Sequence, residues 1–408
     1  MISTYSLENG MRLIHSKSPT KVAYCGIAID GGTRDEKKSE YGIAHFCEHM
    51  MFKGTGKRKA WHILNRMESV GGDLNAYTNK EETVIYSAFM NQHLERATEL
   101  LCDIVFNSSY PQNELEKESE VIIEEIESYN DSPSELIFDE FENMVFEKHQ
   151  LGHDILGNTE QIRSYRSENL ISFVNRIYKP ENMVFFVFGD YDFEYVKKIA
   201  IKYTSLYTEN TTKRHRSRKK EKYSYLPKTK YISKSTHQAH VMIGCPAYSS
   251  DDKRRVALYF LNNIIGGPGM NSLLNVALRE HNGLVYTVES NLTNYTDSSL
   301  FSIYFGCDIN DVEKCVSIVR KELDKLMIEG ISKNKFTASL KQIKGQIGVA
   351  CDNFENYALD MAKSYLHYNK FEGIDETFKL LDKLTPALLQ EVANDLFKED
   401  NLSMLVYN

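Results

Sequence analysis

The stretch Asn75-Ala-Tyr-Thr-Asn-Lys-Glu-Glu-Thr-Val-Ile-Tyr-Ser-Ala-Phe89 is rich in β-branched and aromatic residues. It predicts a strand pair that follows the turn residues Gly71-Gly72. A stretch of the same character, Asn291 to Phe305, lies in the second half of the chain. The segments 113–139 and 334–360 correspond in the same way, at nearly the same offset in sequence. Since solenoid repeats are much shorter, a repeat that spans half of the chain indicates a duplicated domain.

Each half of the chain combines strands with helices around this strand pair. Strands are predicted at Val22–Asp30 and Gln238–Cys245, and a second strand pair at Leu284–Cys307. The residue pattern predicts helices at 42–52, 60–70, 91–105, 111–129, 252–265, 271–281, 310–329 and 333–350. Helices grouped between strand pairs favour an α+β or α/β architecture in which helices pack on a sheet.

The best candidate for a domain boundary is the polar, highly charged region near residues 208–228. Its run Lys213-Arg-His-Arg-Ser-Arg-Lys-Lys-Glu-Lys222 shows no apolar periodicity and predicts an exposed linker. We therefore expect a first domain at 1–210, a basic linker at 211–228 and a second domain at 229–408. A nucleic-acid or anionic-surface patch at 213–222 is the alternative, which the acidic balance of the whole chain disfavours.

The composition is that of a globular protein and excludes several functional classes. Of the 408 residues, 42% are hydrophobic and 26% charged, and a net charge of −8 argues against a dedicated nucleic-acid binder. The sequence shows no signal peptide and no window of 18 consecutive apolar residues, so we expect a soluble, cytoplasmic protein. The seven cysteines include no C-x-x-C pair, which indicates free thiols in a reducing compartment.

The segment Gly42-Ile-Ala-His-Phe-Cys-Glu-His-Met-Met-Phe52 carries the strongest chemical signal. On a helix His45 and His49 lie one turn apart on one face, so both imidazoles can reach one zinc ion at the usual ~2.0–2.1 Å. Glu48 lies beside this face, where it can reach a metal-bound water without being a ligand. Histidines that merely fill a core are the alternative, but buried polar groups without partners are costly. Cys47 is disfavoured as a nucleophile, because helix residues one or two positions apart point in different directions. Neither His45 nor His49 is therefore placed to take a proton from its thiol.

A zinc peptidase needs a third protein ligand and an open fourth position. The glutamate-rich segment Glu114–Glu127 predicts a helix with an inward-facing apolar stripe. Spacing alone leaves the ligand open among several of its carboxylates. Glu125 lies on the inward side, and Glu118, two helical turns earlier, shares that face.

The sequence His45-Phe-Cys-Glu-His49, followed by Met-Met-Phe-Lys-Gly-Thr, resembles the inverted zinc motif of the pitrilysin/insulinase family of metallopeptidases, the inverzincins. The likeness is greatest to the branch of the mitochondrial processing peptidases and their bacterial homologues, and it covers nearly the whole chain. Further matching stretches follow the family's order and spacing: Leu7–Leu13, Gly31–Glu36, Gly71–Tyr86, Glu118–Glu125, Gln238–His240 and Arg279–Tyr286.

The resemblance implies an α+β fold of two homologous α/β-roll domains that form one half of a clamshell around a peptide chamber. It implies one Zn2+ per chain, bound by His45, His49 and Glu125, with Glu118 orienting a ligand histidine. Glu48 is then the expected general base, which takes a proton from the zinc-bound water and delivers it to the leaving amine.

The resemblance also assigns roles outside the zinc motif. Asn75 and Ala76 are expected to bind an extended peptide by strand addition. Arg279 and Tyr286 are expected to reach the substrate from the second domain and to stabilise the oxyanion. The alternative interpretation of these two residues is a surface ion pair and a core aromatic.

The second half departs from the family pattern. The segment Lys253–Ile265 lacks H-x-x-E-H, Gln346 falls opposite Glu125, and Asn271-Ser272-Leu273 stands where the family usually has Ser-Arg-Leu. Only the first half can therefore hold a catalytic zinc ion.

The sequence thus predicts a zinc-dependent endopeptidase that hydrolyses peptides or unfolded segments. With 408 residues the chain is half as long as the one-chain clamshell enzymes. A homodimer is the first expectation, and a heterodimer with a related subunit is the second. The alternative function is a non-catalytic partner or scaffold subunit of a processing-peptidase-like complex, which the intact ligand set disfavours. Neither a nucleic acid nor a membrane is an expected partner.

Overall fold

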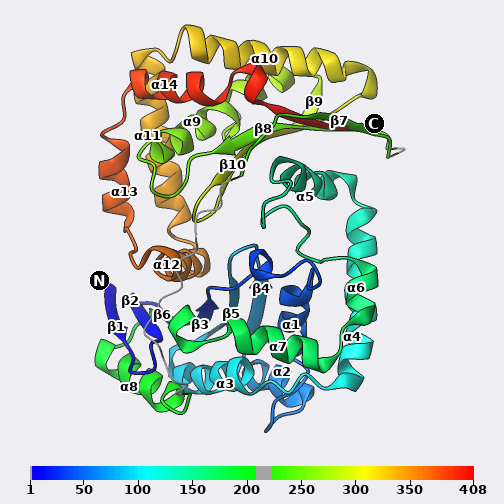
Figure 1. The fold of residues 1–408 in the computed structure, drawn as a ribbon. Coiled ribbons are helices and arrows are strands. Elements are labelled where there is room, and N and C mark those ends of the chain that lie inside the picture. Colours follow the sequence, from blue (N-terminus) through cyan, green and yellow to red (C-terminus); the bar gives the residue numbers. More distant parts are fainter. Residues whose placement is uncertain (1, 208–222, 235) are drawn as a thin grey trace. The chain divides into compact units, whose positions relative to one another are not determined.

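The computed structural model describes residues 2–207, 223–234 and 236–408, which form two compact units of mixed α+β structure (Figure 1). The first unit comprises the described residues within Met1–Glu127, His153–Arg218 and Cys351–Phe371. The second comprises those within Ser128–Gly152, Lys219–Ala350 and Glu372–Asn408. The basic run Lys213–Lys222, and with it most of the predicted linker 211–228, lies outside the described residues.

A six-stranded sheet is the centre of the first unit, with strands at Ile2–Ser6 (β1), Arg12–Lys17 (β2), Val22–Ile29 (β3), Asp73–Thr78 (β4), Thr83–Met90 (β5) and Met183–Gly189 (β6). Their order is β1-β2-β6-β3-β5-β4. β2 and β6 run parallel, and the other neighbouring pairs are antiparallel. β6 is apolar and buried along its whole length, as befits a central strand.

Apolar residues of the first sheet pack against helices on both faces. One face and most of the helices enclose a core that includes Leu13, Ile27, Ile85 and Phe185. The helices of this unit span Ile43–Met51 (α1), Ala60–Glu68 (α2), Leu94–Asn107 (α3), Gln112–Asn130 (α4, up to Glu127), Thr159–Ser164 (α6), Ser167–Ile177 (α7), Phe193–Thr204 (α8) and Phe354–Tyr368 (α12). α12 covers the opposite face alone among the described helices of this unit.

The second unit repeats this plan with five strands at Thr229–Ile232 (β7), Ala239–Ala247 (β8), Val285–Asn294 (β9), Ser299–Cys307 (β10) and Ser403–Tyr407 (β11). The order β7-β11-β8-β10-β9 matches β2-β6-β3-β5-β4, and β7 and β11 form the corresponding parallel pair. The two sheets are therefore related as the repeat predicted, and the α+β class is confirmed.

The helices of the second unit span Pro133–Val145 (α5), Arg255–Gly266 (α9), Val312–Ile328 (α10), Lys333–Ala350 (α11), Ile374–Leu381 (α13) and Pro386–Leu396 (α14). Where sequence periodicity predicts a helix at 271–281, the chain forms a π-helix at Asn275–Glu280. The predicted helices and strands of both halves otherwise appear close to their expected bounds.

Each half of the sequence contributes one helix to the other unit. α12 packs Met361, Tyr365 and Leu366 against the first sheet, whereas α5 packs Ile137 and Phe141 against the second. The simple division at 1–210 and 229–408 places these segments with their neighbours in sequence. Packing instead assigns 351–371 to the first unit and 128–152 to the second.

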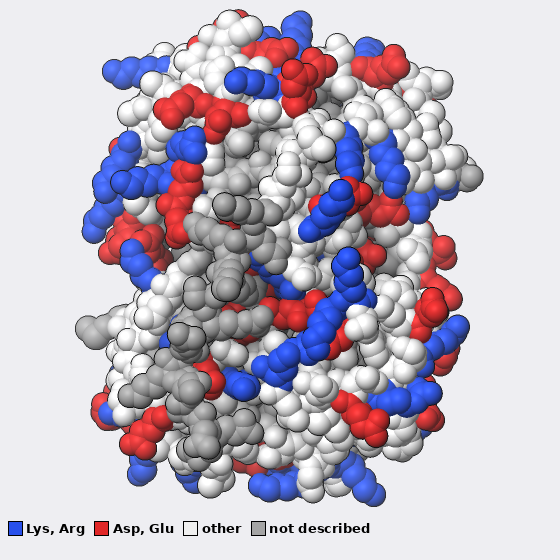
Figure 2. All heavy atoms as spheres, in the orientation of Figure 1, with Lys and Arg blue, Asp and Glu red and all other residues white. Residues whose placement is uncertain are grey.

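The surface carries both signs of charge. On the face drawn in Figure 2, Lys and Arg side chains lie among Asp and Glu side chains over much of the area. Within the described ranges, the helices are all too short or too polar to cross a lipid bilayer.

Candidate active site

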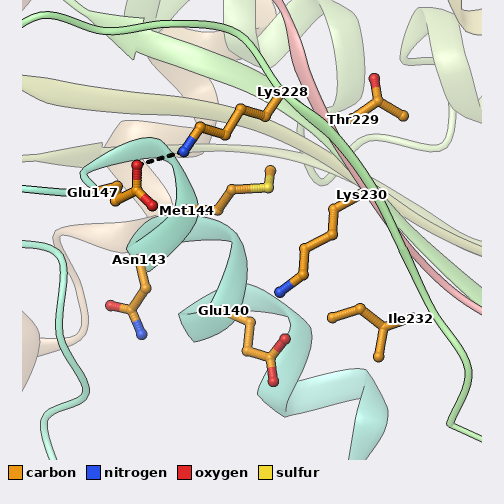
Figure 3. Close-up of a pocket in the computed structure, with 8 residues that line it drawn as sticks. All are labelled: Glu140, Asn143, Met144, Glu147, Lys228, Thr229, Lys230 and Ile232. Carbon is orange, nitrogen blue, oxygen red and sulfur yellow. Dashed lines mark hydrogen bonds and ion pairs between the residues drawn. The ribbon is translucent and has the colours of Figure 1, made fainter.

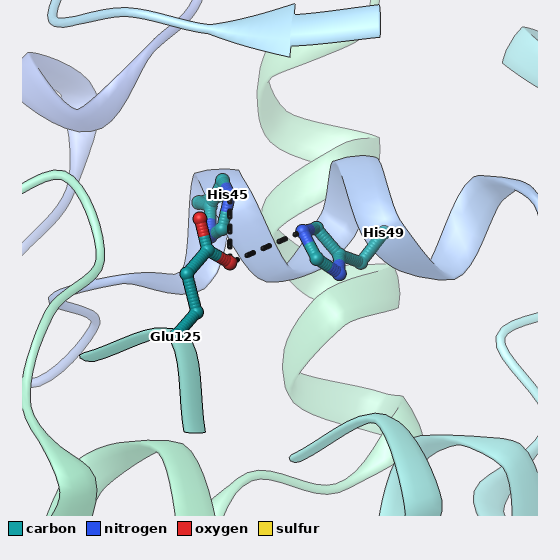
Figure 4. A group of neighbouring side chains, drawn as sticks. All are labelled: His45, His49 and Glu125. Atoms are coloured by element: carbon teal, nitrogen blue, oxygen red, sulfur yellow. Dashed lines mark ion pairs between the residues drawn. The ribbon is translucent and has the colours of Figure 1, made fainter. Parts of the chain in front are cut away.

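Helix α1 brings His45 and His49 onto one face, with ring centroids 4.5 Å apart. α4 supplies the third group, because Glu125 Oε2 lies 3.9 Å from His45 Nε2 and 3.7 Å from His49 Nε2 (Figure 4). One ligand atom from each of the three side chains lies within 4.8 Å of the others. Two helices that are well separated in the sequence thus meet at one point.

The donor set and its geometry fit a zinc ion. Four ligands at ~2.0–2.1 Å in a tetrahedron are about 3.3 Å apart. The two histidine–glutamate distances of 3.9 and 3.7 Å come near this spacing. Burial, together with the nearby His49, lowers the pKa of His45 to about 3, which keeps its imidazole neutral and able to donate a lone pair. His45 Nδ1 is buried without a hydrogen-bond partner among the described residues, so the ring's interactions are directed through Nε2.

Glu118 contacts His49 on the side of the ring away from Glu125. Its Oε1 lies 2.9 Å from His49 Nδ1, which leaves His49 Nε2 directed at Glu125. Lys53 Nζ lies 2.5 Å from the other oxygen of Glu118. Burial opposes ionisation of Glu118, but the hydrogen bonds from His49 and Lys53 outweigh it and lower its pKa. An anionic Glu118 fixes the tautomer and the orientation of His49.

Glu48 has the environment of a proton acceptor. It is 8% exposed, and burial raises the pKa of its carboxyl group, although a hydrogen bond from Thr78 and the charge of His49 act in the opposite direction. Its Oε2 is buried without a hydrogen-bond partner among the described residues. A carboxylate with a raised pKa and a free oxygen beside two imidazoles is suited to accept a proton from water.

A buried carboxylate fixes the start of α1. Glu36 accepts hydrogen bonds from the backbone N–H groups of Gly42 at 3.0 Å and Ala44 at 2.8 Å, which satisfies two donors of the first helical turn. Gly42 has a φ of 85°, and a Cβ there would lie 2.6 Å from the carbonyl oxygen of Leu156. Only glycine fits this entry into the helix. His153 Nε2 lies 3.1 Å from Glu36 and secures it.

The strand predicted to bind peptide is an edge strand. Asn75 and Ala76 lie on β4, which pairs with β5 on one side, and no other described strand pairs with its outer edge. β4 packs beside α1 and ends at Thr78, which hydrogen-bonds Glu48. The unpaired backbone N–H and C=O groups of this edge therefore lie on a strand that contacts the histidine helix α1.

Arg279 and Tyr286 lie together in the second unit, on the π-helix and at the start of β9. The Arg279 guanidinium carbon is 5.8 Å from the centroid of the Tyr286 ring, and Arg279 Nε is 3.7 Å from Glu280. Tyr286 is 84% exposed, so it is not a core aromatic. Both side chains are accessible to a ligand.

Amide side chains form hydrogen-bonded pairs in the second unit. Asn263 Nδ2 on α9 donates to Gln346 Oε1 on α11 at 2.9 Å. Asn271 and Gln342 exchange two hydrogen bonds of 2.9 and 3.0 Å. Gln346, the residue that falls opposite Glu125 in the sequence repeat, thus accepts a hydrogen bond from an amide.

A hollow of about 630 Å³ in the second unit offers no comparable chemistry (Figure 3). It lies between α5 and the edge strand β7, and its carboxylates face lysines. Lys228 Nζ lies 2.5 Å from Glu147, and Lys234 Nζ lies 3.8 Å from Glu140. The residues that line it include no histidine or cysteine.

Three further residues of the first unit contribute to the site, although no residue pattern indicates a role for them. Glu36, Lys53 and Thr78 lie within or next to stretches that carry the family resemblance, but spacing does not show what they touch. The only available signal was their position, since all three lie in the same part of the chain as the histidine motif.

Comparisons with known proteins match the whole chain. The family model described as Insulinase (Peptidase family M16) matches residues 12–159, and the model described as Peptidase M16 inactive domain matches residues 165–343. The chain is 30% identical to the uncharacterized zinc protease YmxG of Bacillus subtilis over 100% of this chain and 98% of the relative. It is 30% identical to an uncharacterized zinc protease of Rickettsia bellii over 98% of this chain and 96% of the relative.

Solved structures have the same fold. A protease from Helicobacter pylori superimposes with a TM-score of 0.94 at 22% identity, covering 100% of this chain and 99% of the other. A peptidase M16 inactive domain from Pseudomonas fluorescens gives a TM-score of 0.92 at 16% identity, covering 100% and 97%.

Proposed function

Because the chain belongs to peptidase family M16, the insulinase family, we propose that it is a zinc-dependent endopeptidase that hydrolyses peptides or unfolded segments. The observation that carries the proposal is the convergence of His45, His49 and Glu125 beside the buried carboxylate of Glu48. The naming of the curated relatives as zinc proteases supports it. The intact set of groups opposes a purely non-catalytic subunit.

The first unit supplies the metal site and the base. His45, His49 and Glu125 hold one Zn2+, and Glu118 orients His49. When bound, the metal ion lowers the pKa of a water molecule to about 7 and polarises the scissile carbonyl. Glu48 accepts the proton that the attacking water loses and then delivers it to the leaving amine. The raised pKa of Glu48 suits both steps, because it lies nearer to neutral pH than that of an exposed glutamate.

Substrate binding uses the edge strand and two residues of the second unit. An extended peptide adds to β4 beside Asn75 and Ala76, so that its backbone pairs with the free edge. Arg279 and Tyr286 hold the substrate and stabilise the developing oxyanion. We propose that two copies of the chain form the peptide chamber. A heterodimer with a related subunit is the other arrangement, and the mass of the purified protein in solution distinguishes them.

The first experiment measures the metal. Purified protein is expected to contain about one zinc ion per chain, and His45→Ala, His49→Ala and Glu125→Ala each remove a ligand and lose it. Glu124→Ala is the matched control, because Glu124 is an exposed neighbour of Glu125 on α4. Elemental analysis that finds full zinc occupancy in the ligand variants contradicts the assignment.

The second experiment tests the second unit. Arg279→Ala or Tyr286→Phe is expected to lower kcat by ~10²–10³, the usual effect of losing one oxyanion donor. Tyr286 is exposed and Arg279 is partly exposed, so the variants are expected to keep their fold and their zinc content. Tyr231→Phe is a control, since Tyr231 is an exposed tyrosine on β7. Wild-type kcat in both site variants would remove these residues from the mechanism.

A further inference from the structure

The turn between β4 and β5 is buried although it is built from charged residues. Lys80, Glu81 and Glu82 are 4%, 3% and 1% exposed. Lysine and glutamate are almost never buried to this extent unless they are paired, because an isolated buried charge is costly. A hairpin turn is normally one of the most exposed parts of a sheet. This one is held from two sides.

A first set of contacts links the turn to the start of the histidine helix α1. Arg34 pairs with Glu81 at 2.6 Å, and its backbone N–H donates to the carbonyl oxygen of Lys80 at 2.8 Å. Lys80 Nζ donates to the backbone carbonyl oxygen of His153. His153 in turn contacts Glu36, the carboxylate that caps α1. The turn and the first residues of α1 therefore belong to one polar network.

A second set of contacts links the turn to α12. Glu82 receives Lys363 Nζ at 2.8 Å, and its other oxygen lies 3.0 Å from His367 Nε2. Asn79 Nδ2 also donates to Glu82 at 2.9 Å. Burial opposes ionisation of Glu82, but these partners outweigh it and lower its pKa. A second contact anchors α12 to the same hairpin, because Tyr86 donates to Glu355 at 2.6 Å.

The position of β4 depends on this turn. β4 is an edge strand, so the described strands hold it through β5 alone. A two-stranded pairing is weak by itself, and its ends fray unless other contacts fix them. The turn at residues 79–82 is where β4 ends, next to Thr78 and Glu48.

We propose that Lys363 and His367 are positioning residues for the peptide-binding strand. Through Glu82 they fix the β4–β5 turn, and they thereby hold the free edge of β4 in a fixed position relative to α1. The second half of the sequence thus sets the substrate affinity of a site whose metal-binding groups all come from the first half. This inference rests on the proposed peptidase function.

Replacement of the lysine in the full-length protein tests the inference. Lys363→Met is expected to raise KM for an extended peptide about tenfold, equivalent to about 1.4 kcal/mol of binding free energy. We expect kcat within about twofold of wild type and an unchanged zinc content. Amide hydrogen exchange in residues 73–78 is expected to become faster. Lys363→Arg keeps the charge and is expected to restore both KM and exchange.

Two further variants complete the design. His367→Ala leaves the Glu82–Lys363 pair in place, so the variant is expected to fold. It removes the second partner of Glu82 and is therefore expected to raise KM and to speed exchange in residues 73–78, as Lys363→Met does. Lys17, at the end of β2 in the same sheet, forms an exposed ion pair with Asp192. Lys17→Met removes this pair and is expected to leave KM, kcat and the exchange of residues 73–78 unchanged.

The inference is overturned if Lys363→Met and His367→Ala lower the melting temperature but leave KM and the exchange of residues 73–78 at wild-type values. In that case α12 stabilises the unit without positioning β4. The exchange measurement needs no catalysis, so it decides the positioning role even if the wild-type chain hydrolyses no peptide. Absence of wild-type hydrolysis would count against the proposed function instead.

Discussion

Glu48→Gln is expected to lower kcat by roughly 10²–10⁴ while the protein keeps its zinc ion. The amide is nearly the same size as the carboxylate, so it preserves the packing around α1 but cannot accept a proton. Glu48 is not among the three side chains that converge on one point, so its replacement leaves the metal-binding groups unchanged. Peptide hydrolysis and elemental analysis of the same preparation measure both quantities.

Glu68→Gln is the control for this variant, because Glu68 is an exposed glutamate at the end of α2. It is expected to match wild type in zinc content and in kcat. If Glu48→Gln retained most of the activity, another group would have to serve as the base.

A fragment of residues 1–210 is expected not to fold on its own. It lacks α12, so one face of the first sheet, including Val184 and Phe186, becomes exposed to water. Burial of Met361 and Leu366 alone contributes roughly 3–6 kcal/mol, which is a large part of the about 5–15 kcal/mol that stabilises a typical domain. Circular dichroism and thermal unfolding of the fragment measure the loss.

A synthetic peptide of residues 351–371 provides the matched test, because it supplies the missing helix in trans. Its addition is expected to restore cooperative unfolding, whereas a peptide with Met361→Asp and Leu366→Asp is expected to have no effect. A fragment that unfolds cooperatively at the wild-type temperature without any peptide would show that α12 is dispensable for the first unit.

The local patterns of the sequence carried over well into the structure. The i, i+4 spacing of His45 and His49 put both rings on one face of α1, because helical geometry depends on neighbouring residues only. The strand pair around Asn75 and its counterpart near Asn291 became β4–β5 and β9–β10 in corresponding sheets. The alternation of β-branched and aromatic residues is likewise a short-range signal.

The different roles of Glu118 and Glu125 follow only from the tertiary structure. Periodicity put Glu118 and Glu125 on the same side of α4 and left both open as ligands. Packing of α4 against α1 places Glu125 Oε2 near both Nε2 atoms, and Glu118 near His49 Nδ1. The distance between two helices depends on the side chains packed between them, which no spacing within one helix specifies.

By itself, the sequence determined the duplication, from a repeat that spans half of the chain, and the histidine helix, from the spacing of residues close together in the chain. The sheet order shows that β4 is an edge strand. Only the tertiary structure decided that α5 and α12 exchange between the units. It also decided that Lys363 and His367 meet Glu82, which lies in the opposite half of the sequence. A helix with an apolar face stabilises whichever sheet buries that face, so the pattern along α12 shows that it must pack but not where. The choice depends on complementary groups that only folding brings together.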